Sequence, residues 1–218
     1  MFNVHTFLVA STTVAFQLAE SAPIRLGSVA RNLSPSDVSE IVQLARERGR
    51  TPWLVIGFPS MIRNEVRLTV YLEPDDHTGQ VRRGTRLLLV ATESRSSERS
   101  DWSVKSTSAY AHVVLPGRAP GDLRDDFDAG RPFAIEGELD DATILSLVAF
   151  IRSNPAIPGV PEGQAPSQVD GKWPISFISR AGETFIVGLS TSEATGQEIT
   201  IERRSGGWVL TKFRWWIV

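Results

Sequence analysis

The sequence predicts an α+β fold made of two tandem repeats, each with one helix packed on a four-stranded antiparallel sheet. A capped amphipathic helix is expected at 33–49, and a second one is expected at 139–155. The same offset of 106 residues that separates these helices also separates Trp102 from Trp208. An offset shared by distant features indicates an internal repeat, and short alternating apolar segments in each half indicate strands.

The composition is that of an ordinary globular protein. Of the 218 residues, 41% are hydrophobic and 22% are charged, and this length suits one large domain or two small ones. The formal net charge of −2 gives no general attraction to nucleic acid or to an anionic membrane, so neither is expected as a partner. The absence of cysteine excludes disulfides, thiolate nucleophiles and cysteine-bound zinc.

The first residues allow two interpretations. An apolar run at 6–19 is too short to span a bilayer as a helix but has the length of a signal-peptide core. No Lys or Arg precedes it, and the alternation of Phe2, Val4 and Leu8 also suits a strand. Residues 1–22 are therefore either a signal peptide, which predicts a secreted or periplasmic protein, or an N-terminal extension of a cytoplasmic one. No longer apolar run follows, so no membrane span is expected.

The first module is expected at 24–116. Its helix begins after Ser34, whose hydroxyl suits an N-cap, and Pro35 suits the first helical position. An apolar stripe at helical spacing follows, made of Val38, Ile41, Val42 and Ala45. Alternating apolar residues predict strands at 53–58, 66–72 and 85–92, and a fourth strand follows the segment 101–105 and runs to Leu115.

A linker at 117–132, rich in Pro, Gly and Asp, leads to the second module at 133–218. Asp140 takes the N-cap position of the second helix. Its apolar stripe is made of Ile144, Leu147, Val148 and Ile151. Strands are predicted at 174–179, 184–190, 197–203 and 208–218.

One helix followed by four strands, twice in one chain, resembles the cystatin-like grouping. In particular it resembles the tandem layout of secreted bacterial β-lactamase inhibitor proteins. The resemblance covers the order of elements across residues 24–218 and includes no sequence motif, and the disulfides of those inhibitors have no counterpart in a chain without cysteine. It implies helices on one face of a joined sheet, an open concave opposite face and a binding role.

Strand parity predicts which residues lie on that open face, because neighbouring strand residues point to opposite sides. In the last strand, Phe213, Trp215 and Ile217 are the more apolar set and are assigned to the helix side. The opposite set combines aromatic residues with cations, as protein–protein contacts often do. The residues assigned to this binding surface are Arg67, Tyr71, Arg86, Tyr110, His112, Lys212, Arg214 and Trp216. The alternative is a solvated face on which Arg and Lys stems lie along aromatic rings.

The sequence thus favours a non-enzymatic, inhibitor-like binding protein with a protein partner, and it leaves the oligomeric state open. No catalytic, metal or cofactor site is predicted, because no G-x-S-x-G motif occurs and the three histidines lack partners at ligand spacing. One alternative is a small-ligand or enzymatic pocket of the nuclear-transport-factor-like cone type, lined by His112 or by Glu198 or Glu202. Another is a structural accessory pair of domains.

Overall fold

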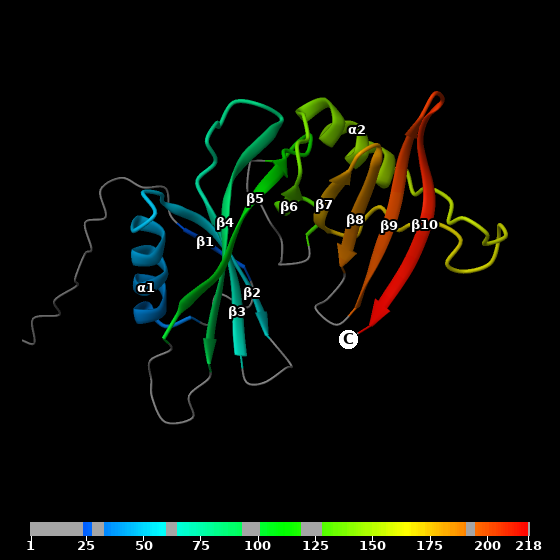
Figure 1. Ribbon diagram of the computed structural model, residues 1–218. Helices are drawn as coiled ribbons and strands as arrows, with labels where there is room; N and C mark the ends of the chain where they lie inside the picture. The colour runs from blue at the N-terminus through cyan, green and yellow to red at the C-terminus, as the bar shows by residue number, and fades with distance from the viewer. Residues whose placement is uncertain are drawn as a thin grey trace, which may run out of the picture.

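The computed structural model describes residues 24–27, 33–59, 65–92, 101–118, 128–190 and 195–217. Within these ranges, ten strands lie in one mixed sheet in the order of the sequence, accompanied by two helices (Figure 1). The elements are β1 (Arg25–Leu26), α1 (Pro35–Arg46), β2 (Pro52–Pro59), β3 (Glu65–Leu72), β4 (Val81–Thr92), β5 (Ser103–Val113), β6 (Phe133–Glu136), α2 (Asp141–Arg152), β7 (Ile175–Ala181), β8 (Thr184–Ser190), β9 (Thr195–Arg204) and β10 (Gly207–Ile217).

This continuous sheet contradicts the predicted fold of two helix-and-four-strand repeats. Two short strands that the sequence does not predict, β1 and β6, pair in parallel with β2 and β7, which makes the sheet mixed. β6 also pairs with β5, so the strands of both halves form one ten-stranded sheet. The two strands have two and four residues. They are too short to show an alternating pattern, and a parallel partner leaves no hairpin-turn signal.

Both helices lie inside the ranges predicted for them and begin at the expected caps. The Ser34 hydroxyl accepts a hydrogen bond from the Asp37 amide, and the Asp37 carboxylate accepts one from the Ser34 amide, which completes a capping box. At α2, the Asp140 carboxylate accepts a 2.7 Å hydrogen bond from the Thr143 amide. These bonds supply partners for amides that have none within the helix.

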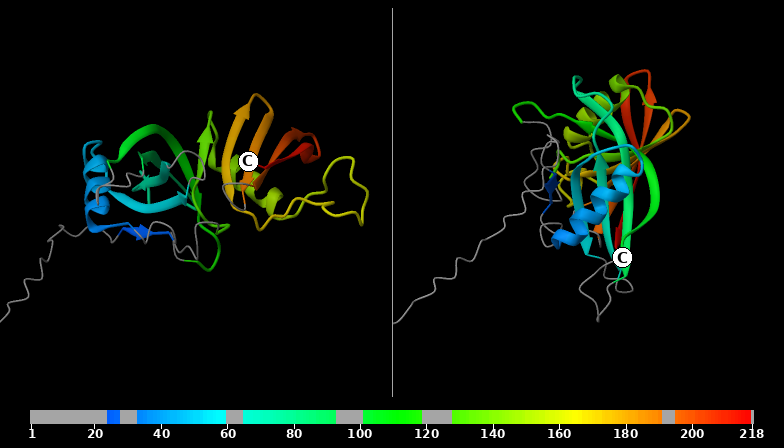
Figure 2. Two further views of the ribbon diagram at one scale, coloured as in Figure 1. Left: turned by 90° about the horizontal axis from the view of Figure 1, so that it is seen from below. Right: turned by 90° about the vertical axis from the view of Figure 1, so that its left-hand side faces the viewer.

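The two helices cover the same face of the sheet. Along β4, Leu87 and Leu89 belong to the core beneath α1, and Val81 belongs to the core beneath α2. These residues are separated by even numbers of positions, so their side chains point to the same face. The α1 core includes Ile41 and Ala45. The larger α2 core includes Ile144, Leu147, Ile151, Val187 and Ile199. Figure 2 shows how strongly the sheet twists between the two helices.

In the first half, the face opposite the helices is filled rather than open. A third core lies there, with each of its buried members at most 3% exposed: Leu54, Ile56, Tyr71 and Tyr110. Residues 128–132, which the sequence assigns to a linker, lie against this face, since Tyr71 Oη donates to the Pro132 carbonyl at 3.1 Å. The open concave surface implied by the resemblance is therefore absent from the described part of this half.

A bulge in β10 changes which residues face the helices. The pairing with β9 shifts after Leu210, where Thr211 is the extra residue. Consequently Leu210 before the bulge and Phe213 after it both pack on the α2 core. Trp215 and Ile217, assigned to the helix side together with Phe213, do not fill this core, because their exposed fractions are 44% and 79%.

Each of the described helices has twelve residues. Neither is long and apolar enough to cross a membrane. The predicted signal peptide or extension at 1–22 lies outside the described residues, so the predicted location of the protein stays a prediction.

Candidate protein-binding site

The structure does not bring the eight predicted surface residues together. Five of them lie on β3, β4 and β5 and three on β10, and β6 to β9 separate the two groups. Tyr71, Tyr110 and His112 are buried, at 3%, 0% and 4% exposure, so they cannot contact a partner at the surface. Arg67 and Arg86 are half-buried, and Arg86 Nε donates to the Ser108 hydroxyl at 2.8 Å.

The buried tyrosine on β5 has structural partners. Tyr110 Oη donates to the Leu72 carbonyl at 2.8 Å and accepts from Trp53 Nε1 at 3.0 Å. Its ring lies over Gly84, where an added Cβ would meet the ring at 2.7 Å. Burial raises the pKa of Tyr110, so the phenol keeps the proton that it donates.

The histidine on the same strand is also enclosed. The His112 ring packs beside the Trp53 ring, with a centroid distance of 5.6 Å. Burial, and after it the charge of Arg82, lowers the pKa of His112 to about 4. His112 is therefore neutral at pH 7 and adds no charge to a binding surface.

The three remaining predicted residues, Lys212, Arg214 and Trp216, lie on β10 at one edge of the sheet. Among the strands that the structure describes, β10 pairs with β9 alone, so its other side presents backbone N–H and C=O groups without a partner in these strands. The opposite edge strand, β1, has only two residues. Within the described ranges, the exposed large hydrophobic side chains are those of Trp215 and Ile217, and both belong to β10.

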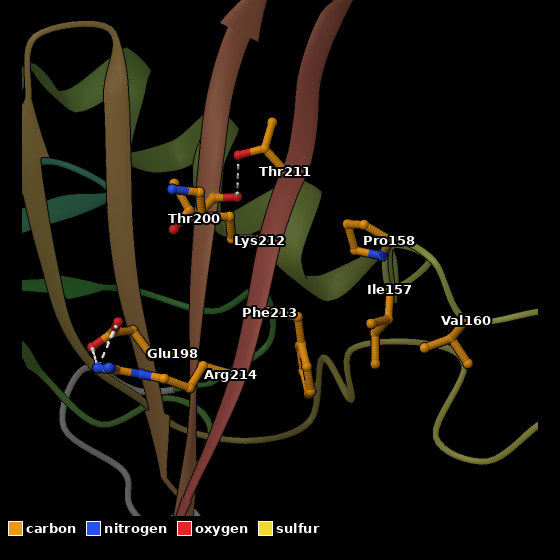
Figure 3. A pocket seen from close by; sticks show the side chains of 9 residues that line it. All are labelled: Ile157, Pro158, Val160, Glu198, Thr200, Thr211, Lys212, Phe213 and Arg214. Carbon is orange, nitrogen blue, oxygen red and sulfur yellow. Dashed lines mark hydrogen bonds and ion pairs between the residues drawn. The ribbon is translucent and has the colours of Figure 1, made fainter.

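A groove of about 610 Å³ lies beside this edge strand (Figure 3). One wall is formed by β10 and its neighbour β9, and the other by Ile157, Pro158 and Val160 of the loop after α2. Figure 3 shows Phe213 pointing toward this loop and Arg214 pointing back over β9 toward Glu198. The groove therefore has an apolar side and a charged side.

The charged side of the groove is mainly cationic. Arg214 forms an ion pair with Glu198 at 2.9 Å, and the two side chains are 69% and 31% exposed. Lys212 is exposed and has no ion-pair partner among the residues that the structure describes. An exposed ion pair adds little stability, so Arg214 can exchange its partner at small cost.

Aromatic rings border the apolar side. The Trp215 ring meets the rings of Phe213 and Trp173 edge-on, with centroid distances of 5.7 Å and 5.3 Å. Trp215 is thus held by two neighbours while almost half of it stays exposed. Trp216 points to the other face and covers Gly196, its partner on β9, so this residue has a packing role as well.

The loop wall of the groove is fixed to the α2 core. Ile157 and Val169 from the two arms of the loop are 4% and 0% exposed. The Ile157 amide donates to the Ser167 carbonyl at 2.8 Å, and the Val169 amide donates to the Pro155 carbonyl at 2.9 Å. The groove is therefore bounded by two packed walls.

Arg152, the last residue of α2, holds the base of this loop. Its guanidinium donates to the carbonyls of Gly171, of Trp173 at 2.7 Å and of Ala129 at 2.8 Å. Burial lowers the pKa of Arg152, although an arginine stays protonated at neutral pH. One side chain thus connects the helix end, the segment before β6 and the segment before β7.

The alternative of a cone-type pocket depends on residues that the structure keeps apart. Glu198 lines the groove, whereas His112 is buried on β5 and Glu202 lies outside the lining. Across the described ranges, no group of three or more His, Asp or Glu side chains is placed to hold a metal ion.

Sequence reasoning missed the apolar side of the groove. Ile157 and Val160 lie in a loop rich in Pro and Gly, where no periodicity assigns a direction to them. Apolar residues inside such a loop were the available signal. Trp215 lies on the helix side with Phe213, as assigned, but it is 44% exposed because β10 extends beyond the core, and this extension has no sequence signature.

Comparison with protein-family models, with curated proteins and with solved structures gave no match. The cystatin-like and inhibitor-like resemblance therefore stays an expectation from the order of elements. Any function assigned to the chain has to rest on its own geometry.

Proposed function

We propose that this chain is a non-enzymatic binding protein that recognises a protein partner through β10 and the groove beside it. One observation carries the proposal. In the described part of the chain, the exposed large hydrophobic residues, Trp215 and Ile217, both lie on the edge strand β10, next to a groove with fixed walls. Lys212 and Arg214, predicted from the sequence as surface residues, border the same groove.

The energetics of such a surface favour recognition. Trp and Arg are enriched in binding hot spots, because they bury a large area and can also hydrogen-bond or form ion pairs. Covering the exposed part of Trp215 would contribute about 2 kcal/mol, at the usual value per unit of apolar area. Because Phe213 and Trp173 already hold the Trp215 ring, little side-chain freedom would be lost on binding.

The proposal is tested by capture from the native source with the wild-type chain and with the double variant Trp215→Ser, Ile217→Ser. Both side chains are exposed, so the variant is expected to fold normally, which circular dichroism checks. A matched control is Lys105→Glu, an exposed change on β5, far from the groove in the sheet.

We expect a protein that wild type and control retain and that the double variant loses. The same protein, once purified, should bind the wild type at least about tenfold more tightly than the double variant. Equal affinity for wild type and double variant would remove β10 as the recognition surface.

A further inference from the structure

We infer that the partner presents an extended segment that pairs with β10 as an eleventh strand, with acidic residues on one face and apolar residues on the other. This inference rests on the proposed function and specifies how the partner is recognised.

The backbone of β10 is open to such pairing. After the bulge, β10 pairs with β9 without interruption from Lys212 to Ile217. This stretch is about 20 Å long, at the usual rise per residue of a strand. Its outward N–H and C=O groups form the template that an added strand uses in β-augmentation.

Only some of the features that usually protect an edge strand occur here. Natural edges are commonly blunted by shortness, by proline, by a bulge or by charged side chains, and the positive charges of β10 act against a cationic strand and not against an acidic one. β1 is protected by having two residues, whereas β10 has eleven and contains no proline. Its bulge interrupts the edge at Thr211 but leaves the last six residues regular.

The two sides of β10 specify the chemistry of the added strand. Residues of an added strand alternate between the faces and contact the cross-strand neighbours on each face. On the helix side they would meet Phe213 and Trp215 and the loop residue Ile157, which favours apolar side chains. On the opposite side they would meet Lys212 and Arg214, which favours carboxylates.

The same charges disfavour a second copy of this chain as the occupant. Two β10 strands paired antiparallel about Phe213 would place Lys212 of one copy opposite Arg214 of the other. Like charges directly opposite each other destabilise a strand pair. An acidic segment of another protein satisfies these cations instead.

Short synthetic peptides test the inference on the full chain. The first alternates valine with glutamate, the second alternates valine with lysine, and the third is the glutamate peptide with every second amide N-methylated. Methylation removes the hydrogen bonds of one peptide edge and leaves the side chains unchanged. Binding is followed by titration calorimetry and by amide hydrogen exchange of β10.

We expect the glutamate peptide to bind, to slow exchange of β10 amides, and to lose at least about tenfold in affinity on methylation. The lysine peptide should bind more weakly, and Lys212→Glu should reverse this preference. The variant Lys105→Glu should change neither.

Three results would overturn the inference. Equal binding of the methylated peptide, without protection of β10, would show recognition through side chains alone. Lack of binding by the glutamate peptide would exclude an acidic strand. Protection of β10 that rises with protein concentration, together with a dimer by sedimentation, would identify a second copy as the occupant. In the first case the proposed function survives, because the double variant Trp215→Ser, Ile217→Ser tests it separately.

Discussion

Aromatic rings lie over glycines of the neighbouring strand at three cross-strand pairs of the described sheet. Tyr110 covers Gly84, and corresponding pairs on β7–β8 and β9–β10 are Phe177 with Gly188 and Trp216 with Gly196. All three rings lie on the face opposite the helices. A ring that covers a glycine shields its backbone and replaces the side chain that glycine lacks, which explains why this face tolerates glycine in strand interiors.

Gly84→Ala tests this packing. The added Cβ would lie 2.7 Å from the buried Tyr110 ring, which is fixed by hydrogen bonds at its hydroxyl and cannot move freely. We expect a loss of about 1–3 kcal/mol in the free energy of unfolding, measured with urea. Gly206→Ala is the control, because nothing lies within 4 Å of its added Cβ. A stability loss shared by both variants would point to backbone effects instead.

His112 predicts a pH dependence of stability. Its pKa is lowered from 6.5 to about 4 in the folded chain. As pH falls below 6.5, protons therefore bind preferentially to the unfolded chain, and stability is lost progressively down to about pH 4. From pH 7 to pH 5, His112 should account for a loss of about 2 kcal/mol.

Urea unfolding of wild type and His112→Gln at both pH values isolates this contribution, because the carboxylates titrate equally in both proteins. Between pH 7 and pH 5, the free energy of unfolding should fall by about 2 kcal/mol less in His112→Gln than in the wild type. Identical pH profiles would mean that His112 is accessible to protons in the folded state.

At the level of elements, the loop between α2 and β7 depends on the end of the helix before it. Arg152 donates to the carbonyls of Gly171 and Trp173 at the end of this loop and to that of Ala129 before β6. The order of these segments along the chain does not predict that their carbonyls meet at one guanidinium. Loss of the guanidinium would leave buried carbonyls without donors, which is costly.

Arg152→Met keeps most of the side-chain volume and should lower the free energy of unfolding by about 3 kcal/mol. Hydrogen exchange of the Ile157 and Val169 amides should also become faster, because the base of the loop is released. Arg46→Met is the matched control, since Arg46 ends α1 and is exposed. Unchanged exchange at Ile157 would show that the loop is held by its core contacts alone.

The helices and most strands could be predicted from the sequence, because caps and alternation are local signals. Ser34 and Asp140 cap the helices as expected, and β8 spans the predicted 184–190. Side-chain direction was harder to predict, because it depends on bulges and on coverage by distant segments. One extra residue at Thr211 puts Leu210 on the same side as Phe213, against strict alternation, and the segment before β6 covers a face that parity alone assigns to solvent.

For the same reason only part of the candidate site could be predicted. Lys212 and Arg214 border the groove as expected for surface residues, whereas Tyr110 and His112 are enclosed. Their burial follows from contacts between residues far apart in the chain, such as Tyr71 with Pro132, which no local pattern reports.

At the scale of the whole molecule, β6 joins the described strands of the two halves into one sheet. Ala134 pairs with Tyr110 on one side and with Phe177 on the other, so the ladder runs through it without a break. Arg83 on β4 reinforces the junction with an ion pair to Asp141 of α2 at 2.7 Å. Two halves whose strands form one hydrogen-bonded sheet, joined also by this ion pair, are expected to unfold together.

We therefore expect a single urea transition by tryptophan fluorescence and by circular dichroism. Ala134→Pro removes an N–H from a central strand and should separate this transition into two, or lower its midpoint strongly. Two resolved transitions already in the wild type would mean that the halves are energetically independent.

One edge of the described sheet is the eleven-residue β10, and the other is the two-residue β1. This difference determines how many partners can add a strand to the sheet. Among the described strands, β10 forms the one long edge, so the sheet can accept one added strand there and offers no equivalent edge for the next. Association through the described edges therefore ends in a closed complex with one partner per chain, and it does not propagate into fibres.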